Sequence, residues 1–538
     1  MKARHLAMAA VLLLVALLAW SGTALADQTA PVDPSVLTEL DAANGAAVPV
    51  IVYAPGHVDD VAADLPIPTA STPLDLIGAV ATTVDGQEVA DLASQPYVQG
   101  IAADVPIFST DYVDTLDVTN TAIGLGALTS PFDGGLDGSG VTVAVVDSGS
   151  DADNPDLADA SGNSRVIGWV DFVKGKRRPY DDGGHGTFVD GLIAGNGSAS
   201  VPVDQGGRAT QQFRGVAPGV DIVSLKVLDR YGEGNSSALI AAIGWAIRHK
   251  AQYDIRVLNI SVEGDVTCAT VRDPMALAVE AAWKAGIVVV CAAGNDGDFG
   301  PGSILSPGND PYVITVGALD TGQTADRTDD TVAHYSSIGP TMFDEFAKPD
   351  LVAPGNKLVS LRARGSYIDR TYPQNRVAVS SYEPGVAPCA QPDYFIMSGT
   401  SASAPVVSGA VALMLERYPR LTPDDVKARL MASADRVAAA KPLAEGAGTL
   451  DVPGALASRA HSDGYALSAD LGDGDTILPP DVELQWQKYA WSKYAWSKYA
   501  WSKYAWSKYA WSKYAWSKYA WSKYAWSKYA WSVVIDGQ

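Results

Sequence analysis

Apolar runs that alternate with helix-like segments constrain the fold of this chain more than any other feature of its sequence. Each run is apolar at nearly every position, which is typical of strands buried on both faces of a parallel sheet. Segments with helical periodicity include residues 237–250, 273–285 and 403–418. Parallel strands need crossover connections, so the pattern predicts an α/β fold: a parallel β-sheet with helices on both faces. The predicted strands are 141–146, 221–227, 256–261, 287–292 and 312–316.

Composition excludes several classes of protein. The 538 residues are 47% hydrophobic and 19% charged, which is enough apolar material for a large core. The formal net charge of −22 argues against nucleic acid as a partner, because nucleic-acid binding needs clustered lysine and arginine. Three cysteines are too few for a disulfide scaffold or a cysteine-rich zinc module. We therefore expect a globular protein that binds no nucleic acid.

The N-terminus has the pattern of a secretory signal peptide. A positively charged start precedes an uninterrupted apolar run over residues 6–20, and residues 24–26 (ALA) have the small-x-small pattern that signal peptidase accepts. A run of about 15 apolar residues is short for a helix that spans a bilayer. The pattern predicts a signal peptide at residues 1–26, cleavage after Ala26 and a secreted, extracellular protein.

Residues 27–118 have a different pattern from the body that follows at 119–460. Short strand-like and helix-like pieces alternate there, which indicates a small α+β unit. The predicted strands of this unit are 48–53, 79–84 and 98–107. Its predicted helices are 59–64 and 87–94.

The C-terminal part of the chain is of low complexity. An Asp-, Gly- and Pro-rich stretch, 461–487, is typical of a linker, KYAWS is then repeated nine times over residues 488–532, and residues 533–538 follow. A period of five spreads tyrosine and tryptophan around a helix axis or over both faces of a strand, so neither conformation gives a one-sided core. Aromatic faces with lysine favour a cell-wall glycan, an anionic polymer or another chain as ligand, and would attach the protein to a cell surface. A tract with no selected role is the alternative.

Three polar residues are flanked in the sequence by apolar or glycine-rich segments. Asp147, in VAVVDSGSD, comes at the carboxyl end of a predicted strand, where sites assemble in open α/β sheets. His185, in DDGGHGTFVDGLIAG, lies between glycines that allow close approach of the backbone. Ser401, in MSGTSASAP, lies at the start of an apolar helix, whose free N–H groups stabilise negative charge. Taken alone, the aspartate could simply end a strand and the serine could simply cap a helix. Together they provide a nucleophile, its general base and a group that orients the base.

Residues 139–455 resemble the subtilisin-like serine proteases, the subtilase family. VAVVDSGSD, GGHGTFVDGLIAG and MSGTSASAP are similar to the family's aspartate, histidine and serine boxes. The histidine box departs from the family's usual pattern at Phe188 and Asp190, neither of which is a catalytic position. Five further blocks follow the order of the family: GVAPGVDIVSLKVLD (215–229), VVVCAAGND (288–296), DPYVITVGALD (310–320), YSSIGPT (335–341) and AKPDLVAPG (347–355).

The resemblance implies a serine endopeptidase that acts on polypeptides and needs no cofactor for its chemistry. It implies an acyl-enzyme on Ser401, with His185 as general base and Asp147 orienting that base. Asn295, in AAGND, carries over as the side chain that donates to the oxyanion, and the backbone N–H of Ser401 would be the second donor. Without the resemblance, Asn295 could be an ordinary turn residue. The alternative function is that of a catalytically silent surface-binding protein that acts through its repeats.

The resemblance also implies a substrate channel between two edge segments, 232–234 (GEG) and 261–264 (SVEG), which clamp an extended substrate through backbone pairing. Glu263 stands where the family usually has a glycine on the wall of the main specificity pocket. We therefore hypothesise that Glu263 favours cleavage after Lys or Arg; a Glu263 that faces solvent is the alternative. The implied substrate-binding residues are Gly232, Gly234, Ser261, Glu263, Gly264 and Gly294.

By the same resemblance, residues 27–118 would be a prodomain that assists folding and inhibits the active site of its own chain until it is cleaved. Structural calcium is common in the family, but no loop here has the pattern of a specific calcium site, and no metal ligand is assigned. Cys291, inside a predicted strand, is expected to be a buried free thiol. Cys268 and Cys389 lie in predicted loops, where an exported chain could join them by a disulfide.

Overall fold

The computed structural model describes residues 29–44, 46–65, 71–109, 135–324, 326–387, 389–437 and 440–471. The predicted signal peptide, the repeats and most of the predicted linker lie outside these ranges. Within the described ranges, none of the helices combines the length and hydrophobicity that a membrane span requires.

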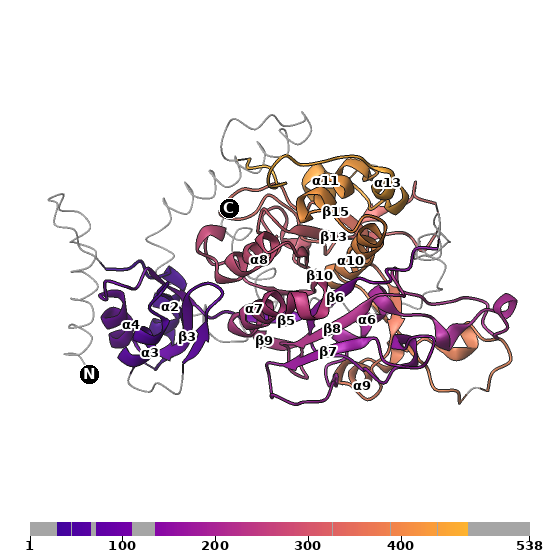
Figure 1. The fold of residues 1–538 in the computed structure, drawn as a ribbon, viewed down its shortest axis with the longest axis horizontal. Helices are drawn as coiled ribbons and strands as arrows, with labels where there is room; N and C mark the ends of the chain where they lie inside the picture. The colour runs from indigo at the N-terminus through magenta and orange to yellow at the C-terminus, as the bar shows by residue number, and fades with distance from the viewer. Residues whose placement is uncertain are drawn as a thin grey trace, which may run out of the picture.

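The larger unit is built on an eight-stranded sheet (Figure 1). Its strands run in the order β14-β13-β12-β10-β6-β8-β7, with β15 also paired to β13, and all pairs are parallel except β13 with β14. Every residue of β6 and of β12 is buried, because helices cover both faces. The predicted parallel α/β fold is therefore confirmed. The strands are β6 (Thr142–Asp147), β7 (Val166–Asp171), β8 (Asp221–Lys226), β10 (Ile255–Ile260), β12 (Val288–Ala292), β13 (Ile314–Asp320), β14 (Thr331–Val332) and β15 (Leu351–Pro354).

Two pairs of helices cover opposite faces of this sheet. α6 (His185–Ala194) packs against α10 (Thr400–Arg417), and α7 (Ser236–Tyr253) packs against α8 (Pro274–Lys284) (Figure 1). α10 lies on β10, β12 and β13, and its first sixteen residues are all buried. A helix that is enclosed on every side is held by packing all around, so its first turn has a fixed position. α11 (Pro423–Ser433), α12 (Pro442–Glu445) and α13 (Val452–Ala457) follow.

The smaller unit is an antiparallel sheet in the order β2-β3-β1-β4, with three helices. β1 and β3 have the bounds that the sequence predicts, because each is a run of mostly buried apolar residues. The elements are α2 (Pro34–Ala42), β1 (Val48–Tyr53), α3 (Val58–Asp64), β2 (Thr72–Leu74), β3 (Ala79–Val84), α4 (Gly86–Ala93) and β4 (Gly100–Ala103).

One short strand leaves the smaller unit and joins the larger one. β5 (Pro106–Ser109) lies between β9 (Glu233–Asn235) and β11 (Val262–Gly264), antiparallel to both. The sequence predicts a single strand over 98–107. The chain instead forms β4 and β5 separately, because the two halves pair with different sheets.

Residues 461–471, which the sequence assigns to the linker, pack onto the larger unit. Ser468 Oγ donates to Asp350 Oδ1 at 2.7 Å and accepts from Lys427 Nζ at 3.0 Å, and Lys348 Nζ donates to Asp350 Oδ2 at 2.7 Å. Burial alone would raise the pKa of Asp350, but the two ammonium groups outweigh burial and lower that pKa. The segment is therefore part of the folded body as far as Leu471.

All three cysteines lie in the described residues and none of them forms a disulfide. Cys291 is a buried free thiol, as the sequence predicts. The disulfide considered between Cys268 and Cys389 is absent. Cys268 is buried beside Asp33 of the smaller unit, and burial is the main cause that raises the pKa of its thiol to about 12, whereas Cys389 is exposed.

Candidate active site

Three predicted site residues lie at or just after the carboxyl ends of strands in the parallel sheet. Asp147 is the last residue of β6, Ser261 follows β10, and Asn295 comes shortly after β12. The chain adds β7 and β8 on one side of β6 and then β10, β12 and β13 on the other, so the carboxyl end of β6 is a topological switch point. Such points are where ligands bind in open α/β sheets.

Asp147 and His185 are in direct contact. His185 Nδ1–H donates to Asp147 Oδ1 at 2.7 Å, and the Ser148 backbone N–H donates to the same oxygen at 2.6 Å. Asp147 and His185 are both buried, with 1% and 2% of the residue surface exposed, respectively. The carboxylate holds the proton on Nδ1, which leaves Nε2 as the ring atom that can accept a proton from a nucleophile.

Asp181, which the sequence analysis did not single out, joins the aspartate and histidine segments. Its Oδ1 accepts from the Ser148 hydroxyl at 2.8 Å and from Gly184 N–H at 2.7 Å. Its Oδ2 accepts from the backbone N–H and the hydroxyl of Thr187, both at 2.8 Å. Because these partners flank Asp147 and His185, Asp181 fixes the start of α6 relative to the end of β6. The acidic pair before the glycines of DDGGHG is the only sequence signal for this role.

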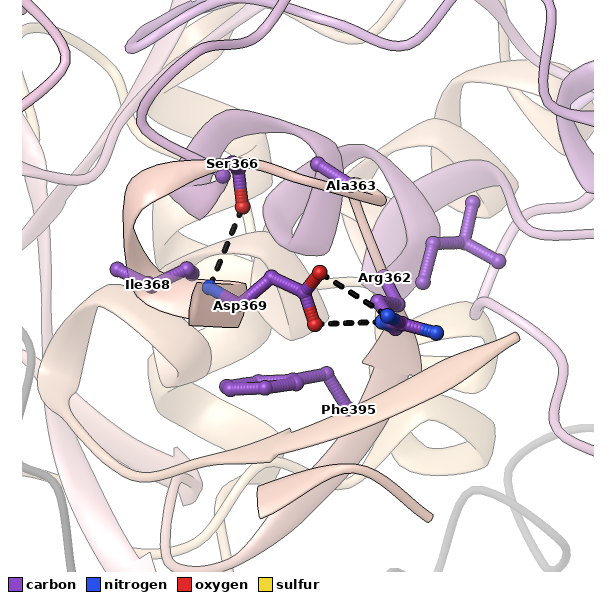
Figure 2. A pocket seen from close by; sticks show the side chains of 8 residues that line it. Arg362, Ala363, Ser366, Ile368, Asp369 and Phe395 are labelled. Carbon is purple, nitrogen blue, oxygen red and sulfur yellow. Dashed lines mark hydrogen bonds and ion pairs between the residues drawn. The ribbon is translucent and has the colours of Figure 1, made fainter. Parts of the chain in front are cut away.

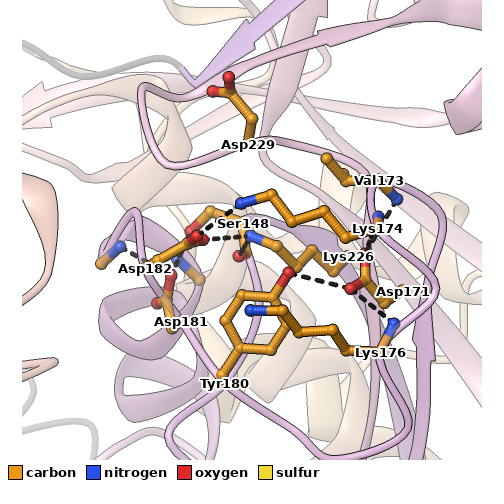
Figure 3. Close-up of polar contacts among 12 residues, drawn as sticks. Ser148, Asp171, Val173, Lys174, Lys176, Tyr180, Asp181, Asp182, Lys226 and Asp229 are labelled. Atoms are coloured by element: carbon orange, nitrogen blue, oxygen red, sulfur yellow. Dashed lines mark hydrogen bonds and ion pairs between the residues drawn. The ribbon is translucent and has the colours of Figure 1, made fainter.

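Lys226, at the end of β8, supports the same region (Figure 3). Its fully buried Nζ donates to the Ser148 carbonyl and to Asp182 Oδ1, the latter at 2.9 Å. Lys174 Nζ donates to Asp182 Oδ2 at 3.0 Å. Burial alone would raise the pKa of Asp182, but the two ammonium groups lower it. A charged residue inside an apolar strand run was the available signal for Lys226.

The turn before His185 packs on the segment 361–369. Tyr367 N–H donates to the Asp182 carbonyl at 2.9 Å. Gly184 has φ +107°, and a Cβ there would lie 2.3 Å from Ser366 Oγ, so only glycine fits. Figure 2 shows the small pocket at this contact, in which Arg362 and Asp369 form an ion pair. None of the substrate-binding residues predicted from the sequence lines that pocket. Its lining is Gly184, Leu361, Arg362, Ala363, Ser366, Ile368, Asp369 and Phe395.

Ser401 is the second residue of α10 and lies beside two other predicted site residues. Its carbonyl accepts from Ser261 Oγ at 2.9 Å. Asn295 Oδ1 accepts from the backbone N–H of Thr400 at 3.0 Å and from its hydroxyl at 3.1 Å. Thr400 therefore fixes the amide by its oxygen and turns the donor end, Nδ2, away from itself. Gly294 N–H donates to the same Thr400 hydroxyl at 3.1 Å.

The other predicted substrate-binding residues flank β5. Ile107 lies opposite Gly234 on β9 and opposite Gly264 on β11. Phe108 lies opposite Glu233 and Glu263, one on each side. Ser109 N–H donates to the Gly232 carbonyl at 3.1 Å. A strand of the chain itself therefore occupies the channel predicted from the two edge segments.

Asp190 is a second buried carboxyl group near Asp147. Burial raises the pKa of Asp190 well above its usual value; the Ser150 hydroxyl acts in the opposite direction, and the charges of Asp147 and Asp181 raise the pKa further. Asp190 therefore keeps a proton in the folded protein at pH values where the unfolded chain has lost it.

The parent protein should lose stability as the pH rises, and we expect the Asp190→Asn variant not to show this loss. Because the folded state holds the proton more tightly, the free energy of unfolding falls above the unfolded pKa of about 4, by up to about 1.4 kcal/mol per pH unit, until the folded pKa is reached. Urea unfolding at several pH values, in a Ser401→Ala background that prevents self-digestion, measures this slope. An identical slope with and without the Asp190→Asn exchange would contradict the prediction.

No group of three or more His, Cys, Asp or Glu side chains is arranged to hold a metal ion within the part of the chain that the structure describes. We therefore assign no residue to structural calcium and derive no step from it.

Comparison with known proteins identifies the family. The family model described as "Subtilase family" matches residues 138–451, more than half of the chain. The chain belongs to the subtilase family. This subtilase is 40% identical over 328 residues to serine protease AprX of Bacillus subtilis (strain 168), covering 59% of this chain and 67% of AprX. It is 32% identical over 301 residues to subtilisin DY of Bacillus licheniformis, covering 56% and 85% of the two chains.

The three-dimensional comparison agrees with the fold described above. The fold of this subtilase matches that of fervidolysin from Fervidobacterium pennivorans, described as a keratinolytic enzyme related to subtilisin, with a TM-score of 0.57 and 21% identity. The match covers 78% of this subtilase and 62% of fervidolysin, less than two thirds of the latter, and it supports the fold alone. As a subtilase, the protein is a serine-type endopeptidase, a hydrolase that needs no cofactor for catalysis.

Proposed function

We propose that this subtilase hydrolyses peptide bonds through an acyl-enzyme on Ser401, with His185 as general base and Asp147 orienting the imidazole. The observation that carries the proposal is the buried hydrogen bond between His185 Nδ1 and Asp147 Oδ1. The position of Ser401 in the first turn of α10, next to the Asn295–Thr400 contact, supports it further.

The proposed reaction has two halves. Ser401 Oγ attacks the carbonyl carbon of the substrate while its proton moves to His185 Nε2, and Asn295 Nδ2 with the Ser401 N–H stabilises the oxyanion. The C–N bond then breaks, and His185 gives its proton to the leaving amine. Water attacks the resulting ester with His185 again as base, which releases the acid and restores the Ser401 hydroxyl.

Labelling with a fluorophosphonate tests the nucleophile. We expect the processed protein to be labelled and the Ser401→Ala variant not to be, because the reagent reacts with an activated serine. Ser403→Ala, two residues further along the same helix, is the matched control and should keep the label. Label that persists in Ser401→Ala would overturn the assignment, and an unlabelled parent would favour the silent surface-binding protein.

We also propose that the smaller unit is a prodomain that inhibits the active site of its own chain. The position of β5 between β9 and β11 supports this inhibitory role, because a substrate strand would need the same backbone groups for pairing. A second contact holds the unit in place: the Asp104 carboxylate accepts from Ser236 Oγ at 2.7 Å and from Ser237 N–H at 2.9 Å, at the start of α7. A carboxylate is favoured at that helix end.

The register of β5 predicts where self-processing occurs. Ser109 lies opposite Val262, and Ser261, which precedes Val262, donates to the Ser401 carbonyl. A substrate strand in the same register would have its next residue opposite Ser261. At about 3.3 Å per residue, the bond presented to Ser401 falls within about two residues after Ser109. N-terminal sequencing of the secreted protein should find this new end, earlier than the boundary at 118 that the sequence suggests. Ser401→Ala should keep the precursor length, and a mature chain that begins at or beyond residue 119 would contradict the register.

Secretion and the ligand of the repeats are further parts of the proposal. The signal-peptide pattern of residues 1–26 supports export, and the aromatic and lysine-rich repeats support attachment to a cell-wall glycan or an anionic polymer. Both segments lie outside the described residues.

A further inference from the structure

Two successive residues of β5, the strand that lies in the predicted channel, have very different surroundings. Ile107 is fully buried and lies opposite two glycines, Gly234 and Gly264. Phe108, the next residue, is 43% exposed and lies opposite two glutamates, Glu233 and Glu263. Side chains alternate between the faces of a strand, so one face of the channel is closed and apolar while the other is acidic.

The two glutamates lie on the same face as the side chain between them. Residues that are directly opposite in antiparallel strands point to the same side, with Cβ atoms about 4.5–5.5 Å apart. Glu233 comes from β9 and Glu263 from β11, so the side chain at the Phe108 position has a carboxylate-bearing neighbour on both sides. Lysine and arginine have the charge and the long apolar stem that suit such a position, since the stem can lie along the strands while the charged end stays hydrated.

The register also gives the distance of this position from the reacting bond. Ser261 donates to the backbone carbonyl of Ser401, so we take the residue opposite Ser261 as the last one before the cut, within the range given above. The residue opposite Val262 is then the second before the cut, and the residue opposite Glu263 is the third.

We propose that Glu233 and Glu263 form a specificity site for a lysine or arginine side chain at the third substrate residue before the scissile bond. The proposal rests on the proposed function and adds a substrate preference to it. It moves the influence of Glu263 from the residue at the cut, where the sequence hypothesis put it, to the position that the strand pairing assigns. The chain's own strand has Phe108 there and gains no charge pairing, so a basic substrate can compete with it once the strand has been cut.

A set of peptides that differ at one position at a time tests the site. In an otherwise constant peptide, Lys, Gln or Glu is placed at each of the four residues before the cut, and kcat/KM is measured for the processed enzyme. We expect Lys to be preferred over Glu by about tenfold at the third residue, with a smaller effect elsewhere, because each partly exposed pair contributes only a few-fold. The preference should shrink in 1 M salt, which screens exposed charges.

Variants assign the preference to the two carboxylates. Glu233→Gln and Glu263→Gln should each reduce the preference for Lys over Glu at the third residue, and the double variant should abolish it. Glu280→Gln on α8 changes the net charge equally and should leave the preference intact. A parent enzyme that cleaves the Gln peptides with no preference at the third residue, or with a preference only at the residue next to the cut, would overturn the inference. Failure to cleave any peptide would instead overturn the proposed function.

Discussion

Replacing Asp147 with asparagine is expected to lower kcat about 10⁴-fold. The carboxylate accepts the Nδ1 proton of His185 at 2.7 Å inside a buried site, and so keeps Nε2 free of a proton. An amide in the same place can donate to Nδ1, which favours the ring tautomer with its proton on Nε2. In that tautomer the imidazole cannot accept a proton from Ser401, and exchanges of this kind in serine protease triads cost about 10⁴-fold. Steady-state peptide hydrolysis, on protein from which another protease has removed the proposed prodomain, measures the effect.

Asp190→Asn is the matched control for that experiment. It makes the same exchange of carboxyl for amide in a fully buried position five residues after His185, but at a carboxyl whose pKa burial raises and which the proposed mechanism does not use. We expect its turnover to stay within a few-fold of the parent. Equal losses of turnover in the two variants would mean that any substitution in this region lowers activity. The assignment of Asp147 to the orienting role would then be withdrawn.

Asn295→Ala is expected to lower kcat about 10²–10³-fold with little change in KM. The amide is proposed to act on the oxyanion, which exists only after the attack by Ser401, so its loss affects the transition state more than the bound substrate. The structure supports this geometry because Thr400 N–H and hydroxyl both hold Asn295 by its oxygen.

Thr400→Val tests the contacts of the amide oxygen separately from the role of the amide N–H. It removes one of the two hydrogen bonds to Asn295 Oδ1 but keeps the backbone N–H and the amide itself, so the loss in kcat should be about tenfold or less. If Asn295→Ala raised KM and left kcat unchanged, Asn295 would be a substrate-binding residue and the second oxyanion donor would have to be found elsewhere.

The parts of the fold that could be predicted from sequence are those that depend on local patterns. Continuous apolar runs indicate strands buried on both faces, and those runs became β6, β8, β10, β12 and β13. The placement of Asp147 at a strand end and of Ser401 at a helix start also follows from neighbours in the sequence. Such signals do not require knowledge of which segments meet.

What the sequence did not provide depends on contacts between distant segments. Asp181 and Lys226 have only weak local signals, an acidic pair before glycines and a charge inside an apolar run, and their role becomes visible only through their bonds to Ser148. The division of one predicted strand into β4 and β5 results from pairing with two different sheets. Likewise, nothing near Cys268 in the sequence indicates that it is buried against Asp33 rather than near Cys389.

Ser468 also completes the buried ionic cluster around Asp350, because its hydroxyl donates to Asp350 and accepts from Lys427. A chain shortened to end before residue 468 would leave a buried carboxylate and a buried ammonium group each with one partner fewer, and is expected to be less stable. Any shortened form of the protein should therefore keep the segment that contains Ser468.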